Sequence, residues 1–110
     1  ALQKQAARQW IAQDRARMVA LSLGPEGAML ITAEQCLVSD ALSVPVAGSV
    51  GAGDSFLAGL VWALDAQTTL EDALATAMAA GAAAVMQPGT ALCHSQDVQR
   101  LRQQVKIRPC

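Results

Sequence analysis

The chain has 110 residues, which is enough for one modest domain built around one hydrophobic core. Apolar residues make up 53 % of the sequence and the formal net charge is −1, which excludes an intrinsically disordered chain. A membrane span is also excluded by the sequence, because no run of about 18 apolar residues lacks polar interruptions.

The lysines and arginines are confined to the two ends of the sequence, and none occurs between Met18 and Gln99. A nucleic-acid surface requires cations gathered on one face, so we expect no nucleic-acid partner. The first residues contain no apolar signal segment, so we expect a protein that is not secreted, and the cysteines favour a cytosolic one. Cys36, Cys93 and Cys110 are irregularly spaced and lack a CxxC pair, so we expect free thiols and no zinc site, with Cys36 in a strand and Cys110 at a frayed terminus.

The first half of the chain predicts one helix followed by short strands. Residues 3–17 favour a helix that buries Leu2, Ala6, Trp10 and Ile11. Residues 18–23 form an apolar run before Gly24-Pro25, which predicts a buried parallel strand ending in a turn. Two further strands are expected at 28–32 and 36–39, joined as a hairpin, with an irregular extended piece at 42–46.

The second half predicts three helices after a glycine-rich loop at 48–53. The first covers 54–64, with apolar residues at helical spacing: Leu57, Leu60, Val61 and Leu64. The second begins near Thr68, which has capping-box spacing to Glu71, and ends at 87–89. Its expected apolar stripe is Leu70, Ala73, Leu74, Ala77, Met78, Gly81, Ala82 and Val85. The last helix begins at Ser95 and carries Val98, Leu101 and Val105.

This order of elements predicts an α/β fold that is incomplete. Three or four short strands cannot cover four amphipathic helices, so we expect part of the sheet to be absent from this chain. The abrupt helical start without Met also favours a fragment. A sheet cut in this way would expose apolar faces, which predicts self-association into a homo-oligomer.

The main chemical signal is Gly51-Ala-Gly-Asp-Ser55 at the start of a helix. Free backbone N–H groups and the helix dipole bind anions there, and glycines allow the anion to approach closely. Asp54 would stand beside that anion as a proton acceptor. The alternative is that Gly51 and Gly53 shape a turn while Asp54 caps the helix. Walker, dinucleotide and GxSxG patterns are all missing.

A second glycine-containing loop, Ser22-Leu-Gly-Pro-Glu-Gly27, follows the first expected strand. It could present N–H groups to a nucleotide, or it could be a plain turn between strands. Together with Ser49–Ser55, Ala79–Ala83 and Gln87–Cys93, this loop resembles the C-terminal part of the ribokinase-like (PfkB) sugar kinases. The resemblance is strongest to the phosphofructokinase and tagatose-6-phosphate kinase branch, and it implies the C-terminal part of a three-layer α/β/α fold.

The resemblance also implies roles for individual residues. Asp54 corresponds to the catalytic base, and Gly51, Ala52 and Gly53 correspond to the anion hole. The loop that contacts ATP corresponds to Ser22, Leu23, Gly24, Pro25, Glu26 and Gly27. Walls of the adenine pocket correspond to Met78 and Ala82. A monovalent-cation site, for potassium, corresponds to the backbone carbonyls of Gly48, Val50, Ala84, Gln87 and Gly89.

The expected function is therefore ATP-dependent phosphoryl transfer to a sugar phosphate such as fructose 6-phosphate. The family's N-terminal part supplies the sugar pocket, the lid and the acidic motif for Mg²⁺, so residues 1–110 represent the nucleotide-binding portion and we expect them to be inactive alone. Two alternatives stay open: a kinase for another sugar or a nucleoside (1-phosphofructokinase, tagatose-6-phosphate kinase or ribokinase type), and a non-catalytic nucleotide-binding or assembly module. His94 beside Cys93 is expected to be a surface residue without a catalytic role.

Overall fold

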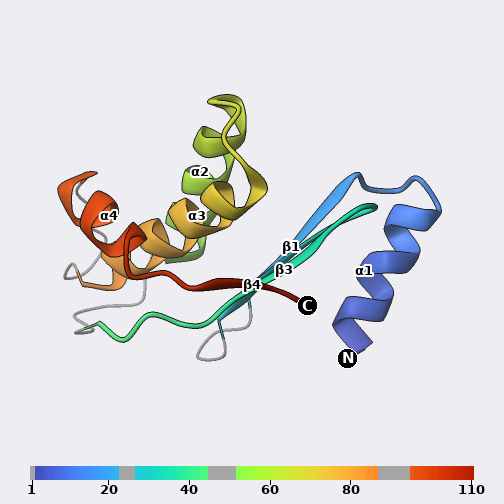
Figure 1. Cartoon of the computed structure of the whole chain (residues 1–110), viewed down its shortest axis with the longest axis horizontal. Coiled ribbons are helices and arrows are strands. Elements are labelled where there is room, and N and C mark those ends of the chain that lie inside the picture. Colours follow the sequence, from blue (N-terminus) through green and yellow to red (C-terminus); the bar gives the residue numbers. More distant parts are fainter. Residues whose placement is uncertain (1, 23–26, 45–51, 87–94) are drawn as a thin grey trace.

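A computed structural model describes residues 2–22, 27–44, 52–86 and 95–110 (Figure 1). Its helices are α1 (Leu2–Ala12), α2 (Ala52–Asp65), α3 (Leu70–Val85) and α4 (Ser95–Arg102). Its strands are β1 (Met18–Ser22), β2 (Ala28–Thr32), β3 (Cys36–Ser39) and β4 (Ile107–Pro109). The four expected helices and the strands expected at 18–23, 28–32 and 36–39 are present, and β4 was not predicted. Helix α4 ends at Arg102, so the expectation that it carries Val105 is wrong. The expected extended piece at 42–46 and the glycine-rich loop at 48–53 lie partly outside the described residues.

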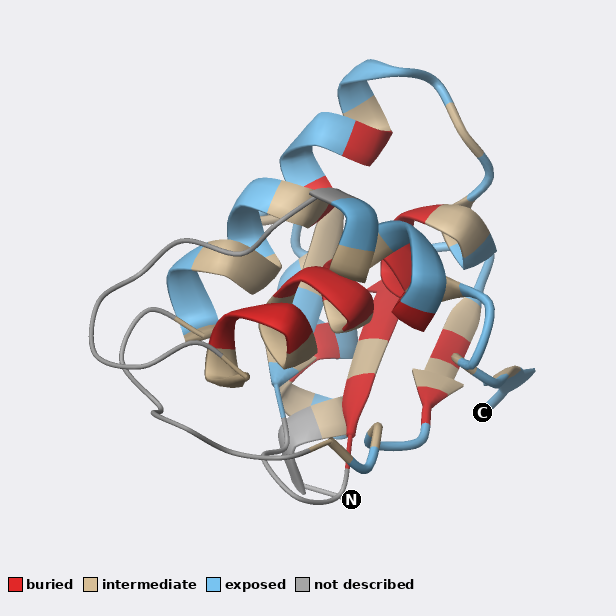
Figure 2. Ribbon diagram, turned by 90° about the vertical axis from the view of Figure 1, so that its left-hand side faces the viewer, coloured by how far each residue is buried: buried red, intermediate tan, exposed pale blue. Residues whose placement is uncertain are grey.

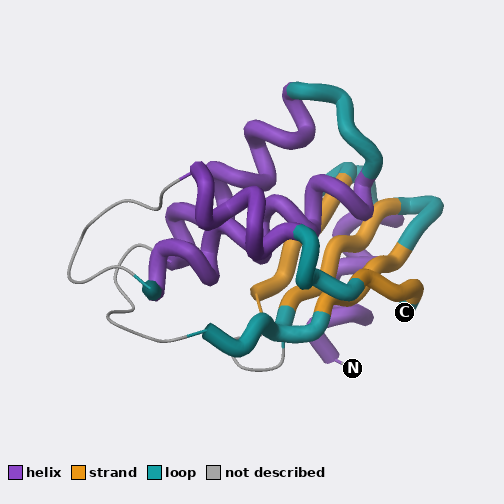
Figure 3. Tube along the Cα trace, turned by 60° about the vertical axis from the view of Figure 1, so that its left-hand side comes forward, coloured by secondary structure: helices purple, strands orange, loops and turns teal. Residues whose placement is uncertain are grey.

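The elements form three layers around a small antiparallel sheet with strand order β1-β2-β3-β4. Helices α2, α3 and α4 lie on one side of the sheet and α1 lies on the other (Figures 1 and 3). Consecutive side chains of β2 point to opposite faces of the sheet, because side chains alternate along a strand. Leu30 packs into the core that α2 and α3 form with the sheet, whereas the next residue, Ile31, is fully buried outside that cluster.

The parallel arrangement expected for the first strand is wrong. β1 pairs with β2 in antiparallel register, with Met18 opposite Thr32 and Ser22 opposite Ala28. A parallel pair requires a crossover of about a dozen residues or more, and only residues 23–27 separate these strands. β1 is also an edge strand and is half-buried rather than buried, since only β2 flanks it.

Helix α1 is shorter than expected and buries a different residue. It ends at Ala12, and Asp14 just beyond it has a φ of 58°, so the helix does not reach Arg17. Ala7 is buried against the rest of the molecule, whereas Trp10 is 49 % exposed and the prediction that it is buried is wrong. The apolar spacing in this glutamine- and alanine-rich segment was too weak to fix the buried face.

The cap of α3 lies one residue beyond the expected position. Thr69 is the N-cap, and its hydroxyl accepts the Asp72 backbone N–H at 3.1 Å. The hydroxyl of Thr68 instead donates to the carbonyl of Ala63 at the end of α2, at 3.0 Å. Both threonines therefore order the α2–α3 connection, and capping chemistry alone could not decide between them.

Helix α3 is buried on more than one face. Besides Ala73, Leu74 and Ala77, the structure buries Ala75, Thr76, Ala79, Ala80, Ala83 and Ala84. The expected single stripe is therefore too narrow. Small side chains permit this because α2 approaches closely: a Cβ added to Gly59 would lie 2.9 Å from the Cβ of Ala80. α3 is the central helix of the described structure, and it packs against α2, α4 and the sheet.

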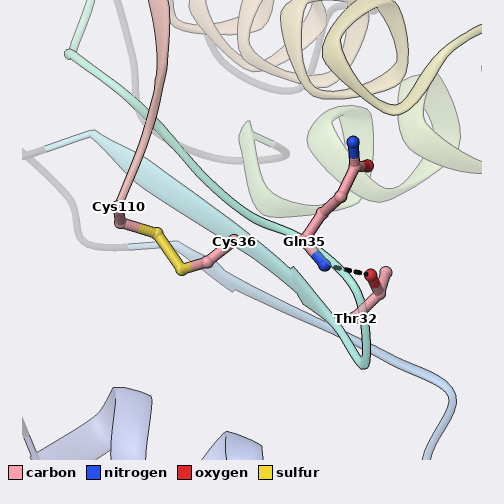
Figure 4. The surroundings of a disulfide bond; sticks show 4 residues. All are labelled: Thr32, Gln35, Cys36 and Cys110. Carbon is pink, nitrogen blue, oxygen red and sulfur yellow. Dashed lines mark hydrogen bonds between the residues drawn. A yellow bond between two sulfur atoms is a disulfide. The ribbon is translucent and has the colours of Figure 1, made fainter.

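Strand β4 closes the edge of β3 and is joined to it by a disulfide. Arg108 lies opposite Val38 in the antiparallel register, and its guanidinium contacts the Asp40 carboxylate at 2.6 Å. Cys110 forms a disulfide with Cys36, and the Cys110 N–H donates to the Cys36 carbonyl at 3.0 Å (Figure 4). The expectation of two free thiols and a frayed end at Cys110 is therefore wrong. The two cysteines are 74 residues apart, and sequence spacing cannot show a pairing over that distance.

Replacing Gly27 with Ala is expected to destabilise the fold strongly. Gly27 is buried with a φ of +103°, and a Cβ at this position would collide with the carbonyl oxygen of Ser39. The left-handed backbone and the overpacking together should lower the free energy of unfolding by about 2 to 5 kcal/mol. Urea denaturation followed by circular dichroism measures the loss. A midpoint equal to that of the unsubstituted chain would show that β2 does not begin against the end of β3 as described.

Candidate functional site

The first turn of α2 carries the residues of the expected anion hole. Ala52, Gly53 and Asp54 begin the helix, and both Gly53 and Asp54 are exposed. The first N–H groups of a helix have no partner within the helix, so they are available to an anion. Gly51, which would precede them, lies outside the described residues. The structure thus places a carboxylate, Asp54, on the same accessible helical turn as these donors.

Gly53 has no packing requirement for glycine in the described structure. A Cβ built on it would meet no heavy atom within 4 Å, and it lies within the helix rather than in a turn. Glycine costs about 1 kcal/mol relative to alanine inside a helix. The tight-turn alternative therefore finds no support at this position. The space that a side chain would fill remains open beside the backbone of the first turn.

Helix α3 passes close to this turn. A Cβ added to Gly81 would lie 3.4 Å from the carbonyl oxygen of Ala52, so α2 begins directly against α3. Met78 and Ala82, the expected adenine-pocket residues, are both half-buried and one turn apart. Met78 packs against the core under the sheet, and Ala82 packs against the cluster that contains Leu101. Their apolar contacts are those of ordinary helix packing, with part of each surface still accessible.

Only the two ends of the expected ATP loop are described. Ser22 is the exposed last residue of β1, and Gly27 is the buried residue before β2, while residues 23–26 lie outside the described structure. The left-handed backbone and close contacts of Gly27 require a glycine at this position. The β1–β2 hairpin therefore accounts for Gly27 without any contact between the loop and a nucleotide.

Of the expected cation ligands, only Ala84 is described, and Gly48, Val50, Gln87 and Gly89 lie outside, as does His94. The carbonyl of Ala84 accepts the backbone N–H of Met86, which leaves it one further lone pair. Among residues 2–22, 27–44, 52–86 and 95–110, no three His, Cys, Asp or Glu side chains are placed to hold a metal ion. In that same part of the chain, no helix is long and apolar enough to cross a bilayer.

An open cleft of about 720 Å³ lies around the β2–β3 turn. It is bordered by α1, the β2–β3 turn and the disulfide, and its charged lining residues are Arg8, Glu34 and Glu71. No residue expected at the nucleotide site lines this cleft. We therefore assign it no part in the candidate site, whose described residues lie on the first turn of α2 and on α3.

Helix α2 has an exposed apolar side, and the sequence pattern did not distinguish its residues from the buried ones. Leu60 is buried as expected and Leu64 is half-buried, but Leu57 and Val61 are 58 % and 55 % exposed. Trp62 beside them is 64 % exposed. Counting by helical period from Asp54 would have placed these three on one face, because 57, 61 and 62 follow it by three, seven and eight residues.

Comparisons with known proteins identify the family of this chain. The chain matches the pfkB family of carbohydrate kinases over residues 2–97. It is 34 % identical over 98 residues to the ATP-dependent 6-phosphofructokinase isozyme 2 of Escherichia coli K12, covering 89 % of this chain and 32 % of that relative. It is 34 % identical over 97 residues to the 1-phosphofructokinase of Vibrio cholerae, covering 88 % of this chain and 31 % of the relative.

A solved structure extends the match to the fold. The crystal structure of phosphofructokinase-2 from Escherichia coli in complex with potassium superposes with a TM-score of 0.87 at 33 % identity. The superposition covers 92 % of this chain and 33 % of that one, so the chain spans about a third of the length of these relatives. On the sequence match and the shared fold together, the chain belongs to the pfkB family of carbohydrate kinases.

Proposed function

We propose that residues 1–110 are the C-terminal, nucleotide-binding portion of an ATP-dependent kinase that phosphorylates a sugar phosphate such as fructose 6-phosphate. One observation carries the proposal: Asp54 is exposed on the first turn of α2, next to a glycine whose side-chain space is open. The relatives named 6-phosphofructokinase isozyme 2 support the choice of acceptor. Because the chain spans a third of their length, we expect it to be inactive without the remaining portion.

In the proposed mechanism, Asp54 accepts the proton of the sugar hydroxyl as that oxygen attacks the γ-phosphorus of ATP. Its position on an exposed turn allows a substrate hydroxyl to reach it. The backbone N–H groups of residues 51–53 would stabilise the negative charge on the transferring phosphoryl group. Fixed helix-terminal donors require no reorganisation during the reaction, so they act mainly on the transition state.

The nucleotide would lie against residues 22–27 and against Met78 and Ala82 on α3, whose partly accessible surfaces suit the flat adenine ring. Mg²⁺, which neutralises phosphate charge when bound, would be held mostly by residues outside this chain. The described residues offer no acidic cluster for it. A potassium site formed by the carbonyls of Gly48, Val50, Ala84, Gln87 and Gly89 is supported by the solved relative in complex with potassium.

We further propose a homo-oligomeric, cytosolic parent protein. A tetrameric inhibited form of phosphofructokinase-2 from Escherichia coli supports the oligomer. The Cys36–Cys110 disulfide does not fit a cytosolic location, because structural disulfides are rare in a reducing cytosol. Alkylation of Cys36 before and after reduction of freshly lysed cells tests it: a thiol at Cys36 in the cell agrees with a cytosolic location.

The Gly53→Ala variant tests whether Gly53 is needed for phosphoryl transfer or for the stability of the fold. We expect the variant to fold with equal or higher stability, because alanine favours the helix and no atom of the described residues lies within 4 Å of the new Cβ. Phosphoryl transfer should fall by about 10-fold or more, since the methyl group would enter the space over the anion-binding donors. The stability of Gly53→Ala is measured on the 110-residue chain. Its phosphoryl transfer is measured on a complete kinase that contains this chain.

The matched control is Gly59→Ala on the same helix. Its Cβ would lie 2.9 Å from the Cβ of Ala80, so it should destabilise the α2–α3 packing by about 1 to 3 kcal/mol. Unchanged phosphoryl transfer in Gly53→Ala would mean that no anion approaches this turn. That result would remove the main support for the proposed function.

A second candidate function has its own support in the 1-phosphofructokinase relatives. It differs from the first only in the acceptor, whose pocket would lie in the portion of the kinase that this chain does not span. Transfer from ATP to fructose 6-phosphate, fructose 1-phosphate and unphosphorylated fructose should be compared in the complete enzyme. We expect the highest kcat/KM for fructose 6-phosphate, and a preference for another acceptor would assign the second candidate or a different sugar.

A further inference from the structure

The Cys36–Cys110 disulfide lies where a small reductant can reach it. Cys110 is exposed at the C-terminal end of the described structure (Figure 2), and Cys36 is half-buried. Both cysteines line the open cleft of about 720 Å³ around the β2–β3 turn. Thiol–disulfide exchange requires access to a sulfur atom, and exposed disulfides are usually the labile, regulatory or catalytic ones. In the cytosolic parent proposed above, a disulfide is likewise expected to be reversible rather than structural.

Reduction by a dithiol converts this bond to two thiols in two exchange steps. One thiolate of the reductant attacks the exposed Sγ of Cys110, the sulfur–sulfur bond breaks, and Cys36 leaves as a thiolate. The second thiolate of the reductant then attacks the reductant's own sulfur in the mixed disulfide and releases Cys110. The reductant loses two electrons and two protons and becomes a cyclic disulfide, and the two cysteines gain them as thiols. A small disulfide reverses the reaction.

Strand β4 has few other contacts that hold it against β3. It is three residues long, and one of them, Pro109, has no backbone N–H to donate. Ile107 packs beside the core, but the ion pair of Arg108 with Asp40 is exposed and such pairs contribute little. Short terminal segments with few buried contacts open at free energies far below that of global unfolding. Reduction should therefore release β4 while the rest of the fold persists.

The end of β3 that β4 covers also supports the proposed ATP loop. Ile107 lies opposite Ser39, and the Arg108 guanidinium contacts the Asp40 carboxylate at 2.6 Å. Gly27, the last residue of the loop, is buried against the same segment, because a Cβ built on it would collide with the Ser39 carbonyl oxygen. Loss of β4 would therefore remove one support of the segment on which the loop ends.

We propose that Cys36–Cys110 is a reversible thiol–disulfide exchange site for a dithiol reductant, and that its redox state controls nucleotide binding. In the oxidised chain, β4 holds the end of β3 and the loop of residues 22–27 ends on a fixed support. In the reduced chain, β4 leaves β3 and that support loosens, so the affinity for MgATP falls. The effect on nucleotide binding rests on the proposed function, whereas the exchange and the release of β4 depend only on the described structure.

Reduction followed by NMR relaxation tests the exchange site without any nucleotide. Dithiothreitol should reduce the folded 110-residue chain in the absence of urea, as measured by alkylation of the new thiols, with no change in the circular dichroism spectrum. The backbone order parameters of Ile107 and Arg108 should fall from about 0.85 to below about 0.6, while those of α3 stay near about 0.85. Oxidation by a small disulfide should restore the first values.

Three results of this experiment would each overturn the proposal. The first is a disulfide that dithiothreitol reduces only in urea, because the sulfur atoms would then be inaccessible in the folded chain. The second is a β4 that stays rigid after reduction. The third is loss of the circular dichroism spectrum on reduction, because the disulfide would then be a crosslink required by the whole fold.

Calorimetric titration with MgATP in both redox states tests the control of nucleotide binding. We expect the dissociation constant of the reduced chain to be at least fivefold higher than that of the oxidised chain. Cys110→Ser cannot form the disulfide, so it should bind MgATP like the reduced chain and should not respond to dithiothreitol. Cys93→Ser is the matched control, which removes the third cysteine and should keep the full response.

A pair of arginine variants locates the contact through which β4 acts. Arg108→Gln removes the ion pair with Asp40 and should raise the dissociation constant of the oxidised chain at least twofold. Arg100→Gln removes an exposed ion pair with Asp97 on α4 and should leave the constant unchanged. Equal affinities of these two variants would overturn the proposed route through Asp40.

The combined outcomes separate the exchange site from the proposed function. Release of β4 with the same MgATP affinity in both redox states would overturn the proposal. Release of β4 in a folded chain that binds no MgATP in either state would support the exchange site and overturn the proposed function, so the two failures are distinguishable.

Discussion

Asp54→Asn is expected to reduce phosphoryl transfer in the complete enzyme by about 10² to 10⁴-fold, the usual contribution of a general base. Asparagine keeps the size of the side chain and can still accept hydrogen bonds, but it cannot take up the hydroxyl proton. The carboxylate is exposed and makes no described ion pair, so the substitution should leave the fold intact. Affinity for ATP should change by less than about threefold, because other residues would hold the nucleotide in the proposed mechanism.

Single-turnover transfer from radiolabelled ATP measures this effect without interference from product release. Asp14→Asn is the matched control: it makes the same charge change at an exposed residue in the α1–β1 connection. Asp14 has a φ of 58°, a conformation that asparagine adopts readily. Near-normal transfer in Asp54→Asn, or an equal loss in the control, would contradict the assignment of Asp54 as the base.

Cys36→Ser is expected to lower the free energy of unfolding by about 4 kcal/mol, the loop-closure value for a crosslink of this span. The disulfide joins residues 74 positions apart and holds β4 on the open edge of β3. Without it, three residue pairs, the packing of Ile107 against the core and the exposed Arg108–Asp40 ion pair remain to hold that strand. Stabilities of small domains are about 5 to 15 kcal/mol, so this loss would be a large fraction of the total.

Urea denaturation with and without a dithiol reductant checks the prediction. The reduced parent chain and Cys36→Ser should have the same lowered midpoint, and reduction should not change the variant further. Cys93→Ser, which removes the third cysteine, serves as the control and should retain its response to reductant. If reduction leaves the midpoint of the parent chain unchanged, the Cys36–Cys110 pair does not stabilise the fold in solution.

Local patterns predicted the elements whose signals lie within a few residues. The β2–β3 hairpin followed from two apolar runs separated by Ala33, Glu34 and Gln35, and the structure confirms it. The start of α4 at Ser95 is confirmed as well. The non-local features were missed: β4 is three residues long, and its pairing with β3 spans most of the chain. The orientation of β1 was an error that the short 23–27 connection could have prevented.

The candidate site divides in the same way. The first turn of α2 was predictable, since two glycines and an acid before an apolar helix predict an anion-binding terminus. The exposed side of α2 was not, because Leu57, Leu60 and Val61 look alike in sequence and only the position of α3 decides which is buried. Gly27 and Gly53 also look alike in sequence. The structure separates them, since one is required by close backbone contacts and the other has open space.

The central claim is that this chain carries the ATP-binding and anion-binding parts of a kinase, and calorimetric titration of the 110-residue chain with MgATP tests it most directly. The titration is run with and without potassium, after circular dichroism has established that the chain is folded. We expect saturable binding with one site, strengthened by potassium and weakened in Gly53→Ala. A folded chain that shows no saturable binding of MgATP under either condition would contradict the account.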